Sequence, residues 1–130
     1  SAGAIGYVSE IFNPLAILSK CQQLDIPILA IRAVQAGALT SSMDRPPHES
    51  GFDKTDFDDF DKAEPFRDLA IEWGESPASL AHRYALSAKG VASVILGVKN
   101  RTELQECVEA EAKDLLSQSE IQQIKNCLRV

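Results

Sequence analysis

The stretch Val91-Ala-Ser-Val-Ile-Leu-Gly97-Val-Lys99-Asn-Arg101-Thr-Glu-Leu-Gln-Glu106 begins with a short apolar run. A glycine, a basic polar turn and a predicted helix follow it. The apolar run is typical of a parallel strand, and Gly97 would let the backbone approach a ligand closely. The N-terminus of the following helix would offer backbone N–H groups to a phosphate. The stretch therefore indicates either a phosphate-binding joint or an ordinary strand–turn–helix connection of an α/β domain.

Length and charge restrict the possible classes of protein. The 130 residues correspond to a single domain, residues 1–130. A net charge of −6 argues against nucleic acid and against an anionic membrane as partners. No apolar run approaches the ~20 residues of a membrane span, and no signal peptide is visible. Since the chain starts at Ser1 without a methionine, we expect a processed or trimmed piece.

The cysteines carry information about redox environment. Cys21, Cys107 and Cys127 are scattered and lack the CxxC spacing of a zinc site. We therefore expect free thiols, no bound metal and a reducing cytoplasm.

Strands and helices alternate along the sequence. Apolar and β-branched runs predict strands, while N-cap residues, prolines at first turns and glycines at ends delimit the helices between them. The predicted strands are Ala4–Phe12, Ile26–Ile31 and Val91–Leu96; the predicted helices are Pro14 to about Leu24, Phe66–Trp73, Pro77 to about Lys89, about Thr102 to Ala112, and one following the capping box Ser117-x-x-Glu120. This order predicts an α/β fold with three parallel strands and crossover helices. Because a continuous apolar run is typical of a strand buried on both faces, and three strands cannot close a barrel, we expect part of a larger architecture.

Thr40–Lys62 is polar, contains two adjacent prolines and is rich in aspartate, which favours a long surface loop. The aspartates from Asp53 to Asp61 are numerous enough for calcium, but the glycine and glutamate of an EF-hand are missing. We interpret the segment as a solvated acidic lid, with Phe52, Phe57 and Phe60 docking it onto the domain.

Three stretches carry a family resemblance: Ile28–Thr40, Glu75–Ser87 and Val91–Glu106 resemble the C-terminal portion of an aldo-keto reductase. The resemblance covers nearly the whole chain. It implies a partial (β/α)8 TIM barrel in which the three predicted strands are the sixth, seventh and eighth. It also implies NADP(H) as the cofactor of carbonyl reduction, bound at the C-terminal ends of the strands.

The resemblance places cofactor contacts on the turn after the last strand. Near the adenosine 2′-phosphate and ribose they are Gly97, Val98, Lys99 and Asn100, with Arg101 as a second basic candidate; near adenine they are Glu103, Glu106 and Cys107. A cationic side chain here would favour NADPH over NADH through charge-assisted contacts. The alternative for Lys99 and Arg101 is a solvated turn. Cys107 departs from the family, which usually has asparagine there.

Other cofactor contacts are implied on the two earlier strands. Ile31 stands where the family often has a tyrosine against the nicotinamide, and Arg32 beside it is a candidate contact for cofactor or substrate. The loop Ala33–Thr40 would meet the pyrophosphate through backbone N–H groups, with Gly37 allowing close approach. Ser9 replaces a common glutamine, and Asn13 matches a polar residue at the end of the sixth strand.

No catalytic residue is predicted. The family's aspartate, tyrosine, lysine and histidine lie on earlier strands, and neither Tyr84 nor His82 falls on those motifs; both are expected to pack or face solvent. One hypothesis is the cofactor-binding part of an NADP-dependent reductase, inactive alone and completed by another barrel portion. The alternative is a non-catalytic domain that folds by self-association as an oligomer.

Overall fold

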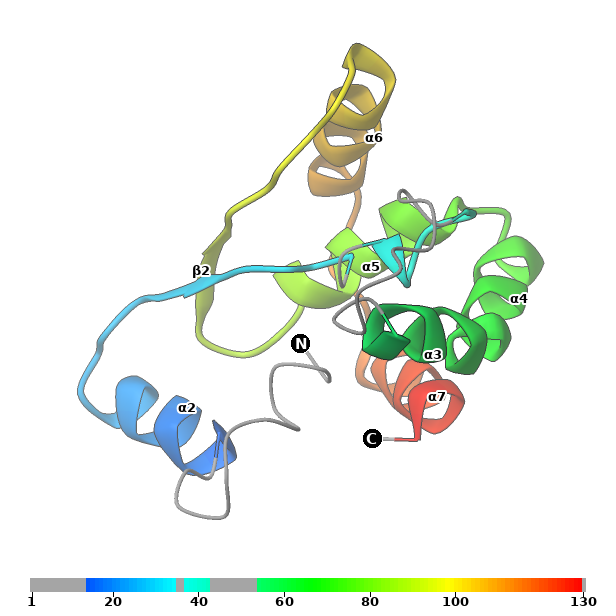
Figure 1. Ribbon diagram of the computed structural model, residues 1–130. Coiled ribbons are helices and arrows are strands. Elements are labelled where there is room, and N and C mark those ends of the chain that lie inside the picture. The colour runs from blue at the N-terminus through cyan, green and yellow to red at the C-terminus, as the bar shows by residue number, and fades with distance from the viewer. Residues whose placement is uncertain (1–13, 35–36, 43–53, 130) are drawn as a thin grey trace.

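The computed structural model describes residues 14–34, 37–42 and 54–129 (Figure 1). In chain order the elements are α2 (Pro14–Gln23), β1 (Ile28–Ala30), α3 (Lys54–Lys62), α4 (Glu64–Glu72), α5 (Pro77–Leu86), β2 (Val91–Val94), α6 (Arg101–Ala112) and α7 (Gln118–Leu128). The predicted strand Ala4–Phe12 lies outside the described residues.

β1 and β2 form a parallel two-stranded sheet, with Ile28 opposite Val91 and Ala30 opposite Val94. The ladder continues one bond further, because the Ile95 N–H donates to the Ala30 carbonyl at 2.8 Å. Helices α3, α4 and α5 lie between the two strands in sequence. The predicted α/β class with a helical crossover between parallel strands is therefore confirmed.

The sheet is less covered than the sequence predicts. Leu29 keeps 59% of its surface exposed and Ile95 keeps 54%. The expectation that Ile26–Ile31 is buried on both faces is thus wrong for this structure. The described helices pack mainly on one another, so part of each strand's apolar surface stays in contact with solvent.

The hydrophobic core lies instead among α4, α5 and α7, on the right of Figure 1. Its largest fully buried side chains are Phe66, Leu80 and Ile124, one from each of these helices. Trp73 and Tyr84 pack against this cluster, which confirms the packing role expected for Tyr84.

The predicted helix boundaries are confirmed at several positions by the side chains that cap them. Ser76 accepts from the Ser79 N–H at the start of α5, and Ser117 and Glu120 form a reciprocal capping box on α7. Gly74, with φ of +71°, follows α4 in a left-handed conformation that suits glycine. The helix expected to reach about Lys89 ends earlier, at Leu86.

The predicted loop over Thr40–Lys62 is wrong in its last part, because Lys54–Lys62 is the helix α3. Its Phe60 ring lies under the Arg67 guanidinium at 3.8 Å, so an aromatic–cation contact fixes α3 to α4. Phe52 and the side chain of Phe57 lie outside what the structure describes.

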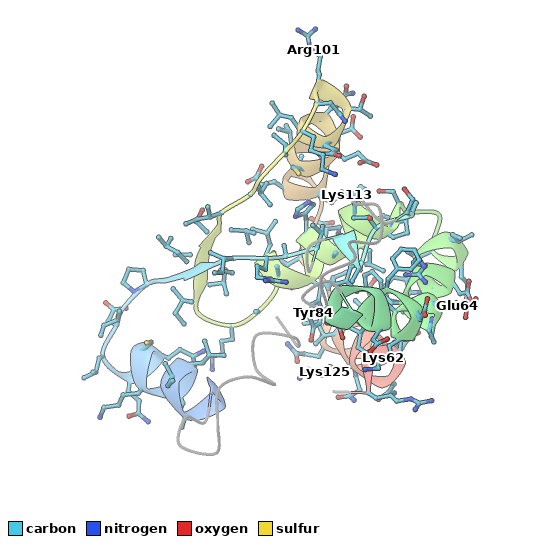
Figure 2. The ribbon with its side chains drawn as sticks, in the orientation of Figure 1. Lys62, Glu64, Tyr84, Arg101, Lys113 and Lys125 are labelled. Carbon is cyan, nitrogen blue, oxygen red and sulfur yellow. The ribbon has the colours of Figure 1, made fainter. Side chains whose placement is uncertain are left out.

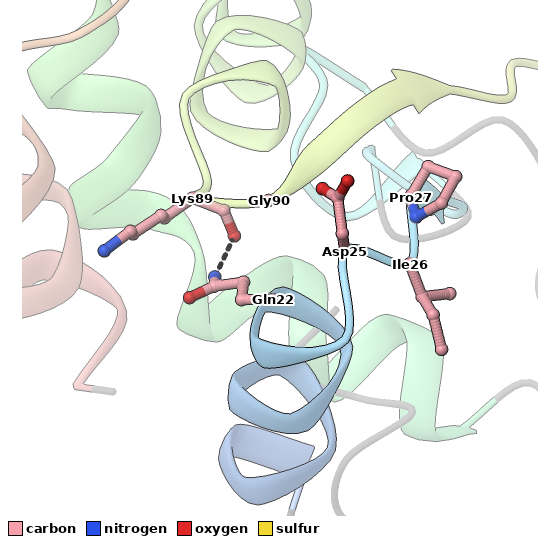
Figure 3. A pocket seen from close by; sticks show the side chains of 6 residues that line it. All are labelled: Gln22, Asp25, Ile26, Pro27, Lys89 and Gly90. Carbon is pink, nitrogen blue, oxygen red and sulfur yellow. Dashed lines mark hydrogen bonds between the residues drawn. The ribbon is translucent and has the colours of Figure 1, made fainter.

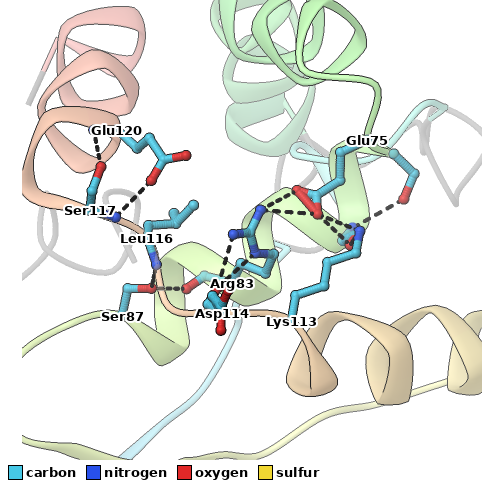
Figure 4. Close-up of polar contacts among 10 residues, drawn as sticks. Glu75, Arg83, Ser87, Lys113, Asp114, Leu116, Ser117 and Glu120 are labelled. Atoms are coloured by element: carbon cyan, nitrogen blue, oxygen red, sulfur yellow. Dashed lines mark hydrogen bonds and ion pairs between the residues drawn. The ribbon is translucent and has the colours of Figure 1, made fainter.

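A polar clamp joins the start of α5 to the linker between α6 and α7 (Figure 4). The Glu75 carboxylate accepts from Arg83 at 2.9 Å and from Lys113 at 2.6 Å. Arg83 also donates to the Asp114 carbonyl at 2.9 Å. Burial tends to raise the pKa of Glu75, but the hydrogen bonds from Lys113 and Arg83 outweigh it and lower that pKa.

Candidate functional site

The turn between β2 and α6 is built around a reciprocal cap. The Asn100 side chain accepts from the Glu103 N–H at 3.0 Å, and the Glu103 carboxylate accepts from the Lys99 N–H at 2.7 Å. Asn100 itself has extended backbone, with φ of −151° and ψ of 172°, as expected for an N-cap. The two bonds fix the path of the backbone through Lys99 and Asn100 into the helix.

The basic side chains of this turn lie at an exposed end of the molecule. Lys99 and Arg101 are both exposed, and Figure 2 shows Arg101 pointing away from the tip of α6. The positive end of the helix dipole adds to their charge. However, the Glu103 N–H is already used by Asn100, so the predicted supply of N–H groups for a phosphate does not include it.

Gly97 and Val98 lead into the turn and are exposed. A Cβ added at Gly97 would meet no atom of the described chain within 4 Å. The described fold therefore does not demand glycine here by close packing, and a reason for it would have to come from outside the described residues.

Ile31 and Arg32 follow the C-terminal end of β1, next to the end of β2 in the parallel sheet. Both are exposed, and Arg32 has a left-handed backbone with φ of +58°, uncommon for a non-glycine residue. Because parallel strands end at the same edge, these residues and the Gly97 turn start from one edge of the sheet. This grouping agrees with the order of elements predicted from the sequence.

The loop containing Gly37 is folded onto itself. Gly37 is buried with φ of +96°, its N–H donates to the Val34 carbonyl at 3.0 Å, and the Thr40 N–H donates back to the Gly37 carbonyl at 3.0 Å. The Leu39 N–H also bonds Val34, at 3.2 Å. A pyrophosphate contact through these N–H groups stays a prediction, and it would require them to exchange partners. Ser9 and Asn13 lie outside the described residues.

Cys107 lies in α6 directly after Glu106 and is buried. Its Sγ is 3.1 Å from His82 Nε2 on α5. Burial raises the pKa of the thiol, and the nearby Glu106 and Glu103 raise it further. The thiol thus contacts His82 inside the protein, and its predicted contact with adenine stays a prediction.

A hollow that the sequence did not predict lies at the other edge of the sheet, where both strands begin. It measures about 460 Å³ and is lined by Gln22, Asp25, Ile26, Pro27, Lys89 and Gly90 (Figure 3). Gln22 Nε2 donates to the Lys89 carbonyl at 2.7 Å across it. The residue in the sequence that could have indicated this hollow is Gly90. Its φ is +87°, and a Cβ added there would lie 3.0 Å from the Gln22 side chain.

Two further observations concern metals and membranes. Among the residues that the structure describes, no group of three or more His, Cys, Asp or Glu side chains is arranged to hold a metal ion. No helix in the same residues has the length and apolar character needed to cross a membrane. Cys21, Cys107 and Cys127 are free thiols, as predicted.

Residues 9–129 match the model of the Aldo/keto reductase family. No curated protein matches the chain.

Proposed function

This chain belongs to the aldo/keto reductase family, and we propose that its β2–α6 turn binds the 2′-phosphate end of NADP(H) in a carbonyl oxidoreductase. In this proposal β1 and β2 are the seventh and eighth strands of the family's barrel. Lys99 and Arg101 bind the phosphate, Asn100 and the backbone of Gly97 and Val98 border the ribose, and Glu103 and Glu106 lie near adenine.

The observation that carries the proposal is the exposed basic pair at a preformed helix cap. The bonds of Asn100 and Glu103 define the backbone around Lys99 before any ligand arrives, so little ordering is needed on binding. A phosphate monoester beside two cations at a helix N-terminus is a favourable electrostatic arrangement. NADH lacks that phosphate, so the same turn would distinguish the two cofactors.

The test is a titration of the purified chain with NADPH and with NADH. We expect tighter binding of NADPH, and we expect Lys99→Ala to weaken NADPH binding roughly tenfold, equivalent to about 1.4 kcal/mol, with little change for NADH. Lys125→Ala is the matched control, because Lys125 is an exposed lysine on α7, far from Arg101 in Figure 2. Equal affinities of the parent chain for the two cofactors would contradict the proposal.

We further propose that the 130-residue chain alone does not reduce aldehydes, because none of its residues matches the family's catalytic tetrad. The three free cysteines support placing the protein in a reducing cytoplasm. NADPH-dependent turnover of a generic aldehyde that persists after repurification would refute the first statement.

The exposed strand face supports a second candidate function, a non-catalytic domain that folds by self-association. Leu29, Ile31 and Ile95 present apolar surface that a second copy or a complementary barrel portion would cover. Native mass spectrometry with and without NADPH separates the two candidates. A species that retains NADPH favours the reductase, whereas an oligomer indifferent to NADPH favours the structural domain.

A further inference from the structure

α6 carries the proposed phosphate turn, yet few of its side chains are buried. Its buried residues are Cys107 and Ala110, whereas Leu104 and Val108 on the same helix are exposed. The helix packs mainly against α5. Its orientation therefore depends on its contacts with that neighbour and on the clamp at its C-terminal end, where Lys113 bonds Glu75 at 2.6 Å.

One polar contact between the two helices joins His82 and Cys107. The two side chains are 7% and 8% exposed, and His82 Nε2 lies 3.1 Å from Cys107 Sγ. Burial lowers the pKa of His82, although Glu106 opposes this, and the pKa of Cys107 is raised. Near pH 7 the pair is therefore a neutral imidazole and a neutral thiol. The two groups form a hydrogen bond, and the thiol is not an activated nucleophile.

Among the described residues, the His82 ring makes its hydrogen bond through Nε2, to Cys107. Its Nδ1 atom is buried and has no hydrogen-bond partner among the described residues. The ring borders a hollow of about 110 Å³ that Ser93 and Leu96 of the β2 region and Glu111 also line. A buried nitrogen without a partner costs free energy, so an apolar side chain would serve packing at this position better than histidine does.

The bond is well placed to act on the phosphate turn. Cys107 lies four residues after Glu103, one helical turn along α6, and Glu103 holds the Lys99 N–H at 2.7 Å. Fixing Cys107 restricts rotation of α6 about its own axis, and α6 carries the turn in which Glu103 bonds the Lys99 N–H. We propose that His82 is a positioning residue for the cofactor turn, acting through Cys107. This inference rests on the proposed function.

The experiment compares His82→Leu and Cys107→Ala, which remove the bond, with Cys107→Ser, which keeps a hydrogen-bonding group. In the first two variants we expect amide hydrogen exchange at Glu103 and Leu104 to accelerate at least fivefold relative to the amides of α7. We also expect the ratio of NADPH to NADH affinity to fall at least threefold, with both effects largely reversed in Cys107→Ser. A purely structural role would change overall stability without changing that ratio.

Cys127→Ala is the matched control, since Cys127 is a half-buried thiol on α7 that packs against the core. It should leave the exchange ratio and the cofactor ratio unchanged. Unaltered exchange at Glu103 and Leu104 in both bond-deleting variants would overturn the inference, as would accelerated exchange with an unchanged cofactor ratio. If the parent chain does not prefer NADPH, the proposed function fails, and the exchange data still decide whether His82 positions α6.

Discussion

The helical cluster and the strand pair of this chain differ in how much of their apolar surface is buried. Phe66, Leu80 and Ile124 are completely buried where α4, α5 and α7 meet, whereas Leu29 of β1 and Ile95 directly after β2 remain exposed. The first region supplies packing free energy, and the second presents strand ends and a basic turn. Stability and the proposed binding therefore depend on different parts of the described chain, and substitutions should separate them.

The largest effect is expected in the helical cluster. Phe66→Ala removes a fully buried ring, and we expect the free energy of unfolding to fall by about 3–5 kcal/mol, because transfer and cavity terms add. Ile71→Ala on the same helix is the control, since Ile71 is 69% exposed. Urea unfolding followed by circular dichroism measures both. Similar losses for the two variants would contradict the position of the core.

The clamp around Glu75 should have an intermediate effect. Glu75→Gln deprives Arg83 and Lys113 of their carboxylate, and we expect a loss of about 2–3 kcal/mol at pH 7. Because the folded-state pKa of Glu75 lies below its ordinary 4.5, its contribution is present above that pH and is lost as pH falls through the lowered value.

The difference between parent and Glu75→Gln should therefore shrink as pH falls below about 4.5, the ordinary glutamate value. Urea unfolding at pH 7 and at several pH values below 4.5 tests this. Glu72→Gln, an exposed neighbour on α4, should show no such dependence. A difference in the free energy of unfolding between parent and Glu75→Gln that stays constant with pH would mean that the carboxylate is not the source of the effect.

The smallest effect is expected in the sheet. Leu29→Ser alters a side chain that keeps most of its surface exposed, so the free energy of unfolding of the monomer should change by no more than about 0.5 kcal/mol. Measured at high protein concentration, a much larger loss would show that this face is covered by a partner. The same unfolding assay at two protein concentrations tells these cases apart.

What the sequence predicted well was local. Ser76 and Ser117 each mark a predicted helix start with a side chain that bonds its own backbone, and the structure has those bonds. The cap at Asn100 was not predicted, since that helix was expected to begin at about Thr102. Such contacts need no information from distant parts of the chain. The β2–α6 turn was predicted from a local pattern as well, an apolar run followed by Gly97 and a polar turn.

What the sequence did not predict depends on contacts between distant residues. α3 resembled a solvated loop because its aspartates conceal the helical spacing, and its fixation by Arg67 involves another helix. The burial of His82 against Cys107 joins residues 25 positions apart. The prediction that the β1 region is buried on both faces was wrong, because an apolar run shows that a strand has apolar surface to bury. It does not show whether a neighbouring element covers that surface.

The hydrogen bond from Gln22 to the Lys89 carbonyl closes a loop of 67 residues. For a flexible chain, closing a loop of that length costs roughly 4 kcal/mol of entropy, counting only the part that grows with length. If α4 and α5 form first, the segment becomes more compact and less entropy is lost when its ends meet. The order of events in folding should therefore be helices before sheet, so that the pairing of β1 with β2 follows formation of the helical cluster.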